Sequence, residues 1–224
     1  MKVGELYSHK DGLEYIQTYH QTELNEIYAA INQLNAVNML TKISAEKSKP
    51  SLLFSPEAMN LSLKNNLSRL GWTKVKADSK KGFQEPRIYL EGGREFREMD
   101  GIKNKVGLEI QFGKYAFMGY DIFSKMPIFA KNGLITCGIE VVAMPSLIPH
   151  MSTGVSSFSQ ITMDMRARGV ADLDIPTLII GIDCSDGSWD KVYEKRTRFL
   201  QNPNILIENG EVSAGRAGAK PGPK

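Results

Sequence analysis

The sequence predicts an α/β fold, with a central mixed sheet of about five strands and helices on both faces. The predicted strands are apolar runs, typical of buried strands, at residues 106–112, 134–144 and 175–182. The predicted helices are apolar stripes with helical spacing, at residues 13–38, 55–70, 120–129 and 158–167. These elements do not follow the regular strand–helix alternation of a doubly wound sheet, so we expect a mixed sheet.

The composition excludes several classes of protein. The 224 residues are 42% hydrophobic, as in ordinary globular domains, and no apolar run approaches the roughly 20 residues that a membrane span needs. The N-terminus turns polar at once, so we expect a cytoplasmic protein without a signal peptide. Cys137 and Cys184 lie in strand-like runs and predict buried thiols rather than a disulfide framework or a zinc site. A net charge of +3 does not by itself indicate nucleic-acid binding.

The predicted domain organisation has two parts. Residues 1–208 are expected to form one domain, because their length suits a single sizeable core. Residues 209–224 are rich in Gly, Pro and Lys and have few apolar anchors, so we expect a flexible tail. The sequence contains no internal repeat, no Gly-rich phosphate loop and no Cys/His cluster.

The N-terminal half of the predicted domain is mainly helical. Residues 3–12 are expected to form a short strand or an extended arm. The helix at 13–38 has one apolar stripe, formed by Leu24, Ile27, Tyr28, Ile31 and Leu34. Ser55 is a suitable N-cap and Pro56 suits the first helical position, which predicts a second helix that stops at Gly71.

The later half alternates strands with helices and polar loops. A hydroxyl-rich loop at 150–157 precedes the helix expected at 158–167. After Ser185 we expect one more helix or strand pair with a basic surface. The basic stretch 72–98 has two interpretations, a solvated surface or a loop that follows a phosphate backbone.

The stretch 99–115 carries the predicted chemistry. Apolar and polar residues alternate through its strand, which indicates a strand with one buried face, and Glu109 and Gln111 point to the same face. A turn before the strand can bring Asp100 near them. Such oxygen ligands suit a hard divalent cation such as Mg²⁺, which needs only one or two carboxylates. The alternative is that Glu109 and Gln111 form the solvated face of an amphipathic strand.

The acidic pattern resembles a nuclease motif. Asp100, Glu109 and Gln111 match the PD-(D/E)xK motif in its Glu-x-Gln form. The run at 108–117, Leu-Glu-Ile-Gln-Phe-Gly-Lys-Tyr-Ala-Phe, is similar to the catalytic strand and following turn of the BglII- and BstYI-like type II restriction endonucleases. Similar blocks are Tyr-Ser-His with Gly-Leu-Glu-Tyr-Ile-Gln at 7–17 and Leu-Phe-Ser-Pro at 53–56.

This resemblance covers roughly residues 3–183, with a difference in length at 77–99. It implies a restriction-endonuclease-like core, in agreement with the α/β sheet expected from the periodicity. It leaves the role of 77–99 and of the chain after residue 183 open.

The resemblance implies a type II restriction endonuclease that hydrolyses double-stranded DNA with Mg²⁺ as cofactor. Asp100 and Glu109 would bind the ion, with the carbonyl of Ile110 as a further ligand, and Gln111 would orient the attacking water. Asn60 has two interpretations. It either reaches the water on the metal or a phosphate, or it is an ordinary residue of a helix surface.

The resemblance also implies a homodimer that reads a palindrome, because a two-fold symmetric protein matches a two-fold symmetric site. The expected site is a hexanucleotide with a GATC core, such as RGATCY or AGATCT, cut to leave 5′ overhangs. A cognate DNA methyltransferase is expected in the same system, although not as a physical partner.

Five residues are predicted to bind DNA. Lys114 lies just after the catalytic strand, and Ser152 and Thr153 lie in the hydroxyl-rich loop, where they are expected to contact bases. Arg166 and Arg168 are expected to contact bases or phosphates. The alternative is that Lys114 caps the turn in solvent and that Ser152 and Thr153 cap the following helix.

Two other functions fit the same residues. The carboxylates of a non-catalytic DNA-binding protein would only complete a strand face. A repair-type nuclease on the same core would cut without sequence specificity. Incubating unmethylated plasmid with Mg²⁺, and separately with EDTA, distinguishes the three, because they give discrete fragments, no cleavage and smears, respectively.

Overall fold

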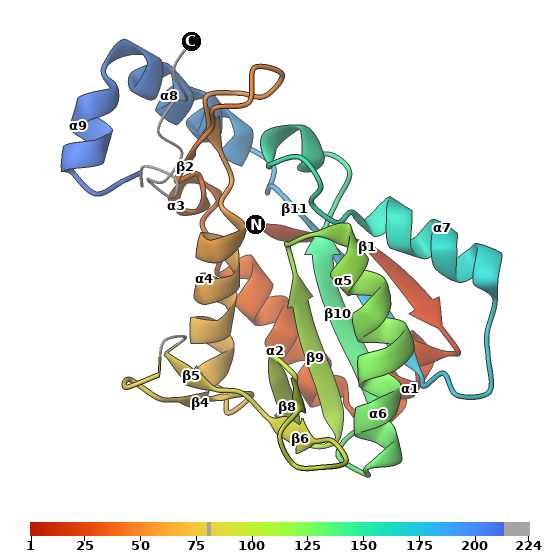
Figure 1. Ribbon diagram of the computed structural model, residues 1–224. Helices are drawn as coiled ribbons and strands as arrows, with labels where there is room; N and C mark the ends of the chain where they lie inside the picture. The colour runs from red at the N-terminus through yellow and green to blue at the C-terminus, as the bar shows by residue number, and fades with distance from the viewer. Residues whose placement is uncertain (80–81, 213–224) are drawn as a thin grey trace.

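The protein is built around a five-stranded sheet with the strand order β1-β11-β10-β9-β8 (Figure 1). The structure is a computed structural model that describes residues 1–79 and 82–212. The strands of the sheet are β1 (Lys2–His9), β8 (Gly101–Lys103), β9 (Val106–Gln111), β10 (Cys137–Ala143) and β11 (Thr177–Asp183). The prediction of an α/β fold with a central mixed sheet of five strands is confirmed for the described chain.

The three central strands are parallel and the two edge strands are antiparallel. β9 and β11 each pair in parallel with β10, whereas β8 pairs with β9 and β1 pairs with β11 in the antiparallel sense. Parallel strands inside a sheet are usually covered on both faces. β9 follows this rule, since every residue from Val106 to Ile110 is buried. The expectation of a single buried face on this strand is therefore wrong, and Glu109 is only 4% exposed.

Helices cover both faces of the sheet. α1, α2 and α4 pack on the face that carries Leu108 and Ile110, while the continuous helix α5–η1–α6 and α7 pack on the other face. These helices are α1 (Gly12–Tyr19), α2 (Gln21–Asn32), α4 (Pro56–Ser68), α5 (Tyr115–Tyr120), the π-helical η1 (Asp121–Lys125), α6 (Met126–Lys131) and α7 (Phe158–Arg168). Because side chains alternate along a strand, Glu109 and Gln111 face α5–η1–α6.

The other elements of the described chain are short or peripheral. α3 (Ala36–Met39), α8 (Ser188–Gln201) and α9 (Pro203–Glu208) pack together near one end of the sheet (Figure 1), so the segment after Ser185 is helical. A 3₁₀ turn, η2 (Ile148–His150), follows β10. The two-stranded ribbons are β2 (Lys42–Ile43) with β3 (Leu52–Leu53), β4 (Lys74–Val75) with β5 (Phe83–Gln84), and β6 (Arg87–Tyr89) with β7 (Phe96–Glu98). In the described ranges, no helix has the length and apolar character to cross a membrane.

Most predicted helices are present, although some of their ends differ. The Ser55 hydroxyl accepts a hydrogen bond from the Ala58 N–H and starts α4, as the N-cap prediction requires. The helix expected at 13–38 is instead divided into α1, α2 and α3. The helix expected at 120–129 begins earlier, at Tyr115, because α5, η1 and α6 are continuous.

The packed chain extends beyond residue 208. Val212 is 4% exposed and belongs to the main hydrophobic core. Its backbone N–H donates a hydrogen bond to the carbonyl of Leu206 in α9. The first residues of the expected tail, 209–212, are therefore packed against the fold, and residues 213–224 lie outside the described residues.

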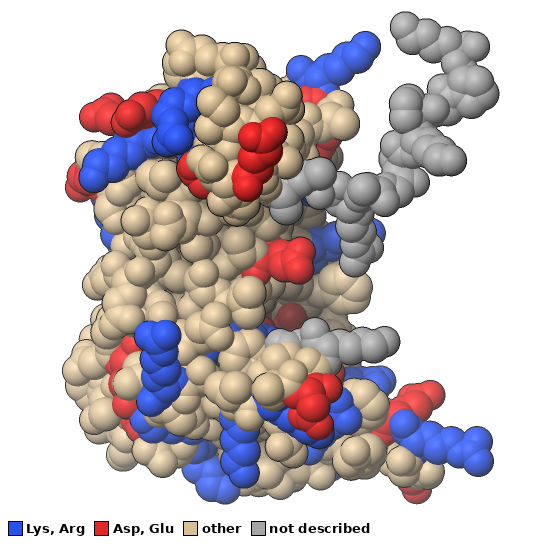
Figure 2. All heavy atoms as spheres, turned by 90° about the vertical axis from the view of Figure 1, so that its left-hand side faces the viewer, with Lys and Arg blue, Asp and Glu red and all other residues tan. Residues whose placement is uncertain are grey.

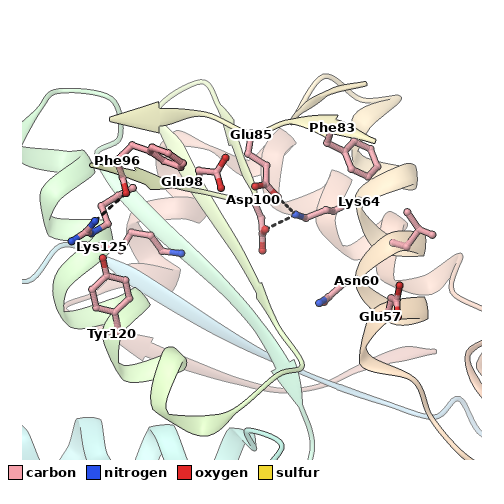
Figure 3. A pocket seen from close by; sticks show the side chains of 12 residues that line it. Glu57, Asn60, Lys64, Phe83, Glu85, Phe96, Glu98, Asp100, Tyr120 and Lys125 are labelled. Atoms are coloured by element: carbon pink, nitrogen blue, oxygen red, sulfur yellow. Dashed lines mark hydrogen bonds and ion pairs between the residues drawn. The ribbon is translucent and has the colours of Figure 1, made fainter. Parts of the chain in front are cut away.

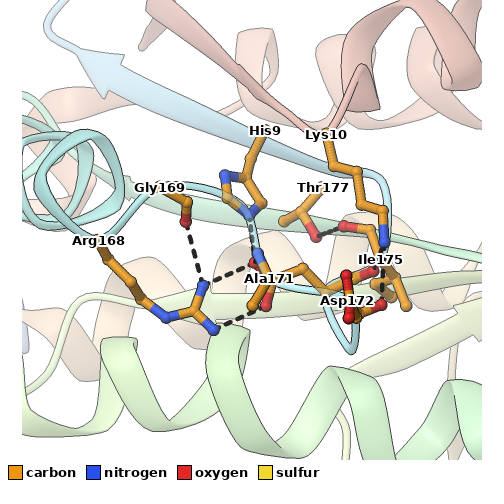
Figure 4. Close-up of polar contacts among 9 residues, drawn as sticks. His9, Lys10, Arg168, Gly169, Ala171, Asp172, Ile175 and Thr177 are labelled. Carbon is orange, nitrogen blue, oxygen red and sulfur yellow. Dashed lines mark hydrogen bonds and ion pairs between the residues drawn. The ribbon is translucent and has the colours of Figure 1, made fainter.

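A buried polar cluster ties the end of β1 to the loop before β11 (Figure 4). His9 Nε2 lies 2.9 Å from Asp174 Oδ2, and both side chains are almost completely buried. Arg168 donates to the two carboxylate oxygens of Asp174, at 2.6 and 2.9 Å, and the Ala171 N–H donates a further bond. Burial alone would raise the pKa of Asp174, but these hydrogen bonds hold it well below its ordinary value.

We expect Asp174→Asn to destabilise the fold by roughly 2 kcal/mol at pH 7, because it weakens a charge-assisted network. A lowered carboxyl pKa stabilises the fold above the unfolded-state pKa, near 3.9, and this contribution is lost as the pH falls toward the folded-state value. Urea unfolding at pH 7 and pH 3 should therefore show a smaller difference between wild type and variant at pH 3. Asp164→Asn, an exposed change on α7, is the control. An equal difference at both pH values would contradict this account.

Candidate active site

The β8–β9 hairpin brings Asp100 next to the C-terminal end of β9. Its turn is formed by Asn104 and Lys105, which both adopt positive φ angles. Asp100 directly precedes β8, and its Oδ2 accepts a hydrogen bond from the backbone N–H of Ile110 at 2.7 Å. β8 pairs with β9 only up to Leu108, and the Asp100 side chain accepts the next hydrogen bond along β9, from Ile110.

A cavity of about 840 Å³ opens beside Asp100, between α4, the ribbons β4–β7 and α5–η1–α6 (Figure 3). Asp100 and Asn60 line it, together with Lys64 and Lys125. Asn60 points into the cavity from α4, and its buried Oδ1 has no hydrogen-bond partner within the described residues. Glu109 does not line the cavity, but its carboxylate contacts Lys125, which does line it.

Each of the two predicted metal-binding carboxylates is paired with a lysine. Lys64 Nζ lies 2.6 Å from Asp100 Oδ1 and also pairs with Glu85 (Figure 3). Lys125 Nζ lies 2.8 Å from Glu109 Oε1. Because each carboxylate already holds a cationic group at contact distance, both are placed and oriented to bind positive charge.

Three buried carboxyl groups lie between the sheet and η1. Asp121 pairs with Lys125 at 2.6 Å, and Glu140 on β10 lies directly opposite Glu109 on β9. Glu140 is fully buried, and neither of its carboxylate oxygens has a hydrogen-bond partner in the described chain. Burial raises the pKa of all three carboxyls, and the neighbouring negative charges raise each pKa further. Burial alone would lower the pKa of Lys125, but Glu109 and Asp121 raise it above the ordinary lysine value.

The oxygen atoms at the Asp100 end of β9 suit a hard divalent cation. The N–H and C=O groups of a strand residue face the same side, so the Ile110 carbonyl faces the side on which Asp100 lies. Asn60 lines the same cavity, with its amide nitrogen directed into it in Figure 3, while its Oδ1 is buried without a hydrogen-bond partner among the described residues. Within residues 1–79 and 82–212, no group of three or more His, Cys, Asp or Glu side chains is arranged to hold a metal. Water and substrate oxygens would therefore complete the ligand shell.

The structure brings three of the five predicted DNA-binding residues together. Lys114 is exposed at the start of α5, and its backbone forms a bridge to the hydroxyl-rich loop. In that loop the Ser152 hydroxyl accepts a hydrogen bond from Lys42, and the Thr153 hydroxyl donates one to Glu46. The two hydroxyl residues are thus held by the segment around β2.

The helix-cap alternative for Ser152 and Thr153 is wrong. The N-cap of α7 is Ser157, whose hydroxyl accepts a hydrogen bond from the Gln160 N–H. The Gln160 side chain accepts one in return from the Ser157 N–H, which completes a capping box. Ser152 and Thr153 precede this cap and belong to the loop.

Arg166 and Arg168 lie in the last turn of α7, and neither lines the cavity beside Asp100. The guanidinium of Arg166 lies 5.2 Å from the centre of the Tyr7 ring. Arg168 is bound to Asp174 and lies 4.2 Å from the centre of the Phe123 ring. Both arginines thus have intramolecular partners, and their predicted DNA contacts remain predictions.

The ribbons β4–β7 form one wall of the cavity. Their lining residues include Phe83, Glu85 and Phe96. Figure 2 shows Lys and Arg side chains gathered on the lower part of the face that these ribbons share with α4, below a hollow that contains acidic side chains. Among the described residues of the ribbon segment, the exposed basic ones are Lys74, Lys76, Arg87 and Arg94. None of these four residues lines the cavity, where the ribbon segment contributes Arg97 together with Glu85 and Glu98, so both interpretations of the stretch 72–98 stay open.

Lys64, Lys125 and Glu140 are not identifiable as site residues from the nuclease motif. Lys64 follows Asn60 by four residues, and this spacing places both side chains on one face of α4. Asp121 and Lys125 have the same spacing, but such pairs are also common on ordinary helix surfaces. Glu140 carries the clearest signal, because a single acid inside an apolar strand is seldom buried without a purpose.

A family model and solved structures match this chain. A family model described as restriction endonuclease BglII/BglIII matches residues 4–182. The crystal structure of restriction endonuclease BglII complexed with a DNA 16-mer has a TM-score of 0.64 and 16% sequence identity, covering 83% of this chain and 80% of that chain. The crystal structure of free BglII has a TM-score of 0.55 and 16% identity, with coverages of 83% and 81%. The comparison with curated proteins gave no match. At this identity the two structures show a shared fold.

We expect Glu140→Gln to raise the melting temperature at alkaline pH but not near pH 5. Because the pKa of Glu140 is raised above 4.5, the native state keeps a proton that the unfolded chain releases, so the wild type loses stability as the pH rises. The variant has no titratable group at this position, so its stability does not fall in this way as the pH rises. Melting curves of both proteins at pH 5 and pH 8.5 measure the effect, with the exposed change Glu208→Gln as the control. A variant that melts below the wild type at pH 8.5 would show that Glu140 is stabilised as a carboxylate.

Proposed function

The chain belongs to the restriction endonuclease BglII/BglIII family, and we propose from this premise how its site cleaves DNA. The protein is a type II restriction endonuclease, that is, a site-specific deoxyribonuclease. We propose that its reaction is the Mg²⁺-dependent hydrolysis of phosphodiesters in double-stranded DNA. In this reaction the oxygen of water bonds to phosphorus and one P–O ester bond breaks. The proton of the water passes to solvent, and the leaving oxygen takes up a proton.

One observation supports the catalytic assignment above the others. The Asp100 carboxylate is bonded to the Ile110 N–H, so it lies beside the strand that carries Glu109 and Gln111 and at the wall of the cavity. A loop aspartate and a strand glutamate are thereby held at one place by the backbone. This arrangement supports Asp100 and Glu109 as the ligands of Mg²⁺, with the Ile110 carbonyl as a further oxygen ligand.

The other site residues have supporting roles in the proposal. When bound, the ion supplies charge neutralisation at the phosphate and makes an attacking water easier to deprotonate. Asn60 lines the cavity with its amide group, which suits a hydrogen bond to a water of the site or to a phosphate. Gln111, the last residue of β9, donates and accepts hydrogen bonds through its amide and would orient the attacking water.

We further propose that the enzyme acts as a homodimer, in which each chain forms a single endonuclease domain. The palindrome that it reads is proposed to be a hexanucleotide with a GATC core, RGATCY or AGATCT, cut to leave 5′ overhangs. A cognate methyltransferase would protect host DNA without binding this protein. Lys114, Ser152 and Thr153, which the structure places near one another, are the proposed base contacts.

Removing either proposed metal ligand should abolish cleavage. We expect Asp100→Asn and Glu109→Gln each to reduce cleavage by roughly 1,000-fold or more, since each removes an anionic ligand, while binding of duplex DNA persists. The measurement is cleavage of an unmethylated plasmid that carries AGATCT and RGATCY sites, with Mg²⁺ and with EDTA.

Asp190→Asn, an exposed change on α8, should cleave like the wild type and controls for the loss of one acidic charge. Cleavage at the wild-type rate by Asp100→Asn or Glu109→Gln would remove that residue from the site. Smears from the wild type would indicate a non-specific nuclease, and absence of cleavage would indicate a binding protein.

Removing a base contact should weaken specific binding only. We expect Lys114→Ala and Thr153→Ala each to cost about 1–3 kcal/mol per half-site on cognate duplex and little on scrambled duplex at the same salt concentration. Binding isotherms in Ca²⁺ measure the difference, with the exposed Lys131→Ala as a control for lost charge. Equal losses on both duplexes would mean that these residues contact phosphates.

A further inference from the structure

We propose that Lys125 is a further catalytic residue, whose ammonium group faces the scissile phosphate and supplies the positive charge that Gln111 lacks. This inference rests on the proposed function, because it assigns a role within the same phosphodiester hydrolysis. It adds a residue that lies outside the Asp-Glu-x-Gln motif and comes from a helix rather than from the catalytic strand.

The π-helical segment η1 determines the position of Lys125. Asp121 and Lys125 are its first and last residues and are joined by an ion pair of 2.6 Å. π-helical turns are rare and are frequently found at functional sites. The Lys125 side chain is 12% exposed and points from the helix toward the cavity (Figure 3), with its Nζ 2.8 Å from Glu109 Oε1. The ammonium group thus lies between a proposed metal ligand and the space that DNA would enter.

The charge balance around Lys125 explains why a positive group is needed there. The carboxylates of Glu109 and Asp121 flank Lys125, and Gln111 on the same strand face is uncharged. A phosphodiester brings a further negative charge, and the reaction increases the charge on its oxygens. Without a nearby cation, Coulomb repulsion would oppose the phosphate at its reacting position. Lys125 supplies such a cation from the helix side.

Lys64, the other lysine that lines this cavity, also contacts two carboxylates, but it lies on a different wall. Its ammonium group is shared between Asp100 and Glu85, and Glu85 belongs to the ribbon wall. Lys64 thus links α4 to that wall. Lys125, in contrast, contacts the strand glutamate from the side on which Gln111 also projects.

A purely structural Lys125 would behave differently. Buried ion pairs contribute little net stability, but removing one partner leaves an uncompensated charge and weakens the fold. In that case, loss of Lys125 would lower the stability, the metal affinity and the cleavage rate together. A positive charge placed elsewhere at the site would then restore none of them.

The experiment compares Lys125→Met, Lys125→Arg and the exposed control Lys131→Met with the wild type in the full-length protein. The readout is the single-turnover cleavage rate of a plasmid that carries AGATCT and RGATCY sites. We expect Lys125→Met to lose about 100-fold or more, as for removal of one donor to a transition-state oxyanion. Lys125→Arg, which keeps the charge, should retain a larger share of the rate, and Lys131→Met should match the wild type. A loss below tenfold in Lys125→Met would overturn the proposal.

The decisive variant moves the charge from the helix to the strand. In Gln111→Lys/Lys125→Met the ammonium group returns at the position of Gln111. We expect at least about tenfold recovery of the rate over Lys125→Met, because one positive charge again faces the phosphate. Gln111→Lys alone should not exceed the wild type. Absence of recovery in the double variant would overturn the proposal.

Titration with Mn²⁺ alone gives a readout besides activity. Removing a cation beside Glu109 should leave the Mn²⁺ dissociation constant of Lys125→Met within about threefold of the wild type, or tighten it. A loss of affinity that parallels the loss of rate would show that Lys125 only holds Glu109, and would overturn the proposal. If the wild type itself does not cleave, the proposed function fails and this inference fails with it. A cleaving wild type with a fully active Lys125→Met overturns the inference alone.

Discussion

The hydrogen bond from the Ile110 N–H to the Asp100 carboxylate is the constraint on which the rest of the site depends. β8 pairs with β9 only as far as Leu108, so without Asp100 the backbone N–H of Ile110 would lack a hydrogen-bond partner on that side of β9. The aspartate occupies this place, and thereby joins the segment before the hairpin to the strand that carries Glu109. The cavity wall, the α4 residues and η1 are all arranged around this junction.

The second constraint is the buried charge between β9, β10 and η1. Carboxyl groups without partners, such as that of Glu140, oppose folding, and an apolar side chain of similar volume would pack at lower cost. The fold tolerates the cost because the core on the other sheet face is extensive and apolar. A site that binds a cation needs several acidic groups close together. Placing them there lowers the local stability of the fold.

Periodicity and capping signals were enough to predict the sheet, the start of α4 at Ser55 and the closeness of Asp100 to β9, because these features depend on neighbours in sequence. Lys125 and Glu140 depend instead on the packing of α5–η1–α6 over β10, which no local pattern encodes. The same limit explains Arg168. At the end of a helix it resembles a DNA contact, but its partner, Asp174, is provided by a loop that folds back on β1.

Ser152 and Thr153 are already satisfied in the free chain, by Lys42 and Glu46. A base edge that approaches this loop has to exchange partners with these two side chains rather than fill vacant positions. In the proposed recognition, DNA would compete with this internal pairing, in which Glu46 occupies the place of an acceptor on a base. Each proposed contact to a base would therefore contribute only the difference in free energy between the new hydrogen bond and the internal one that it replaces.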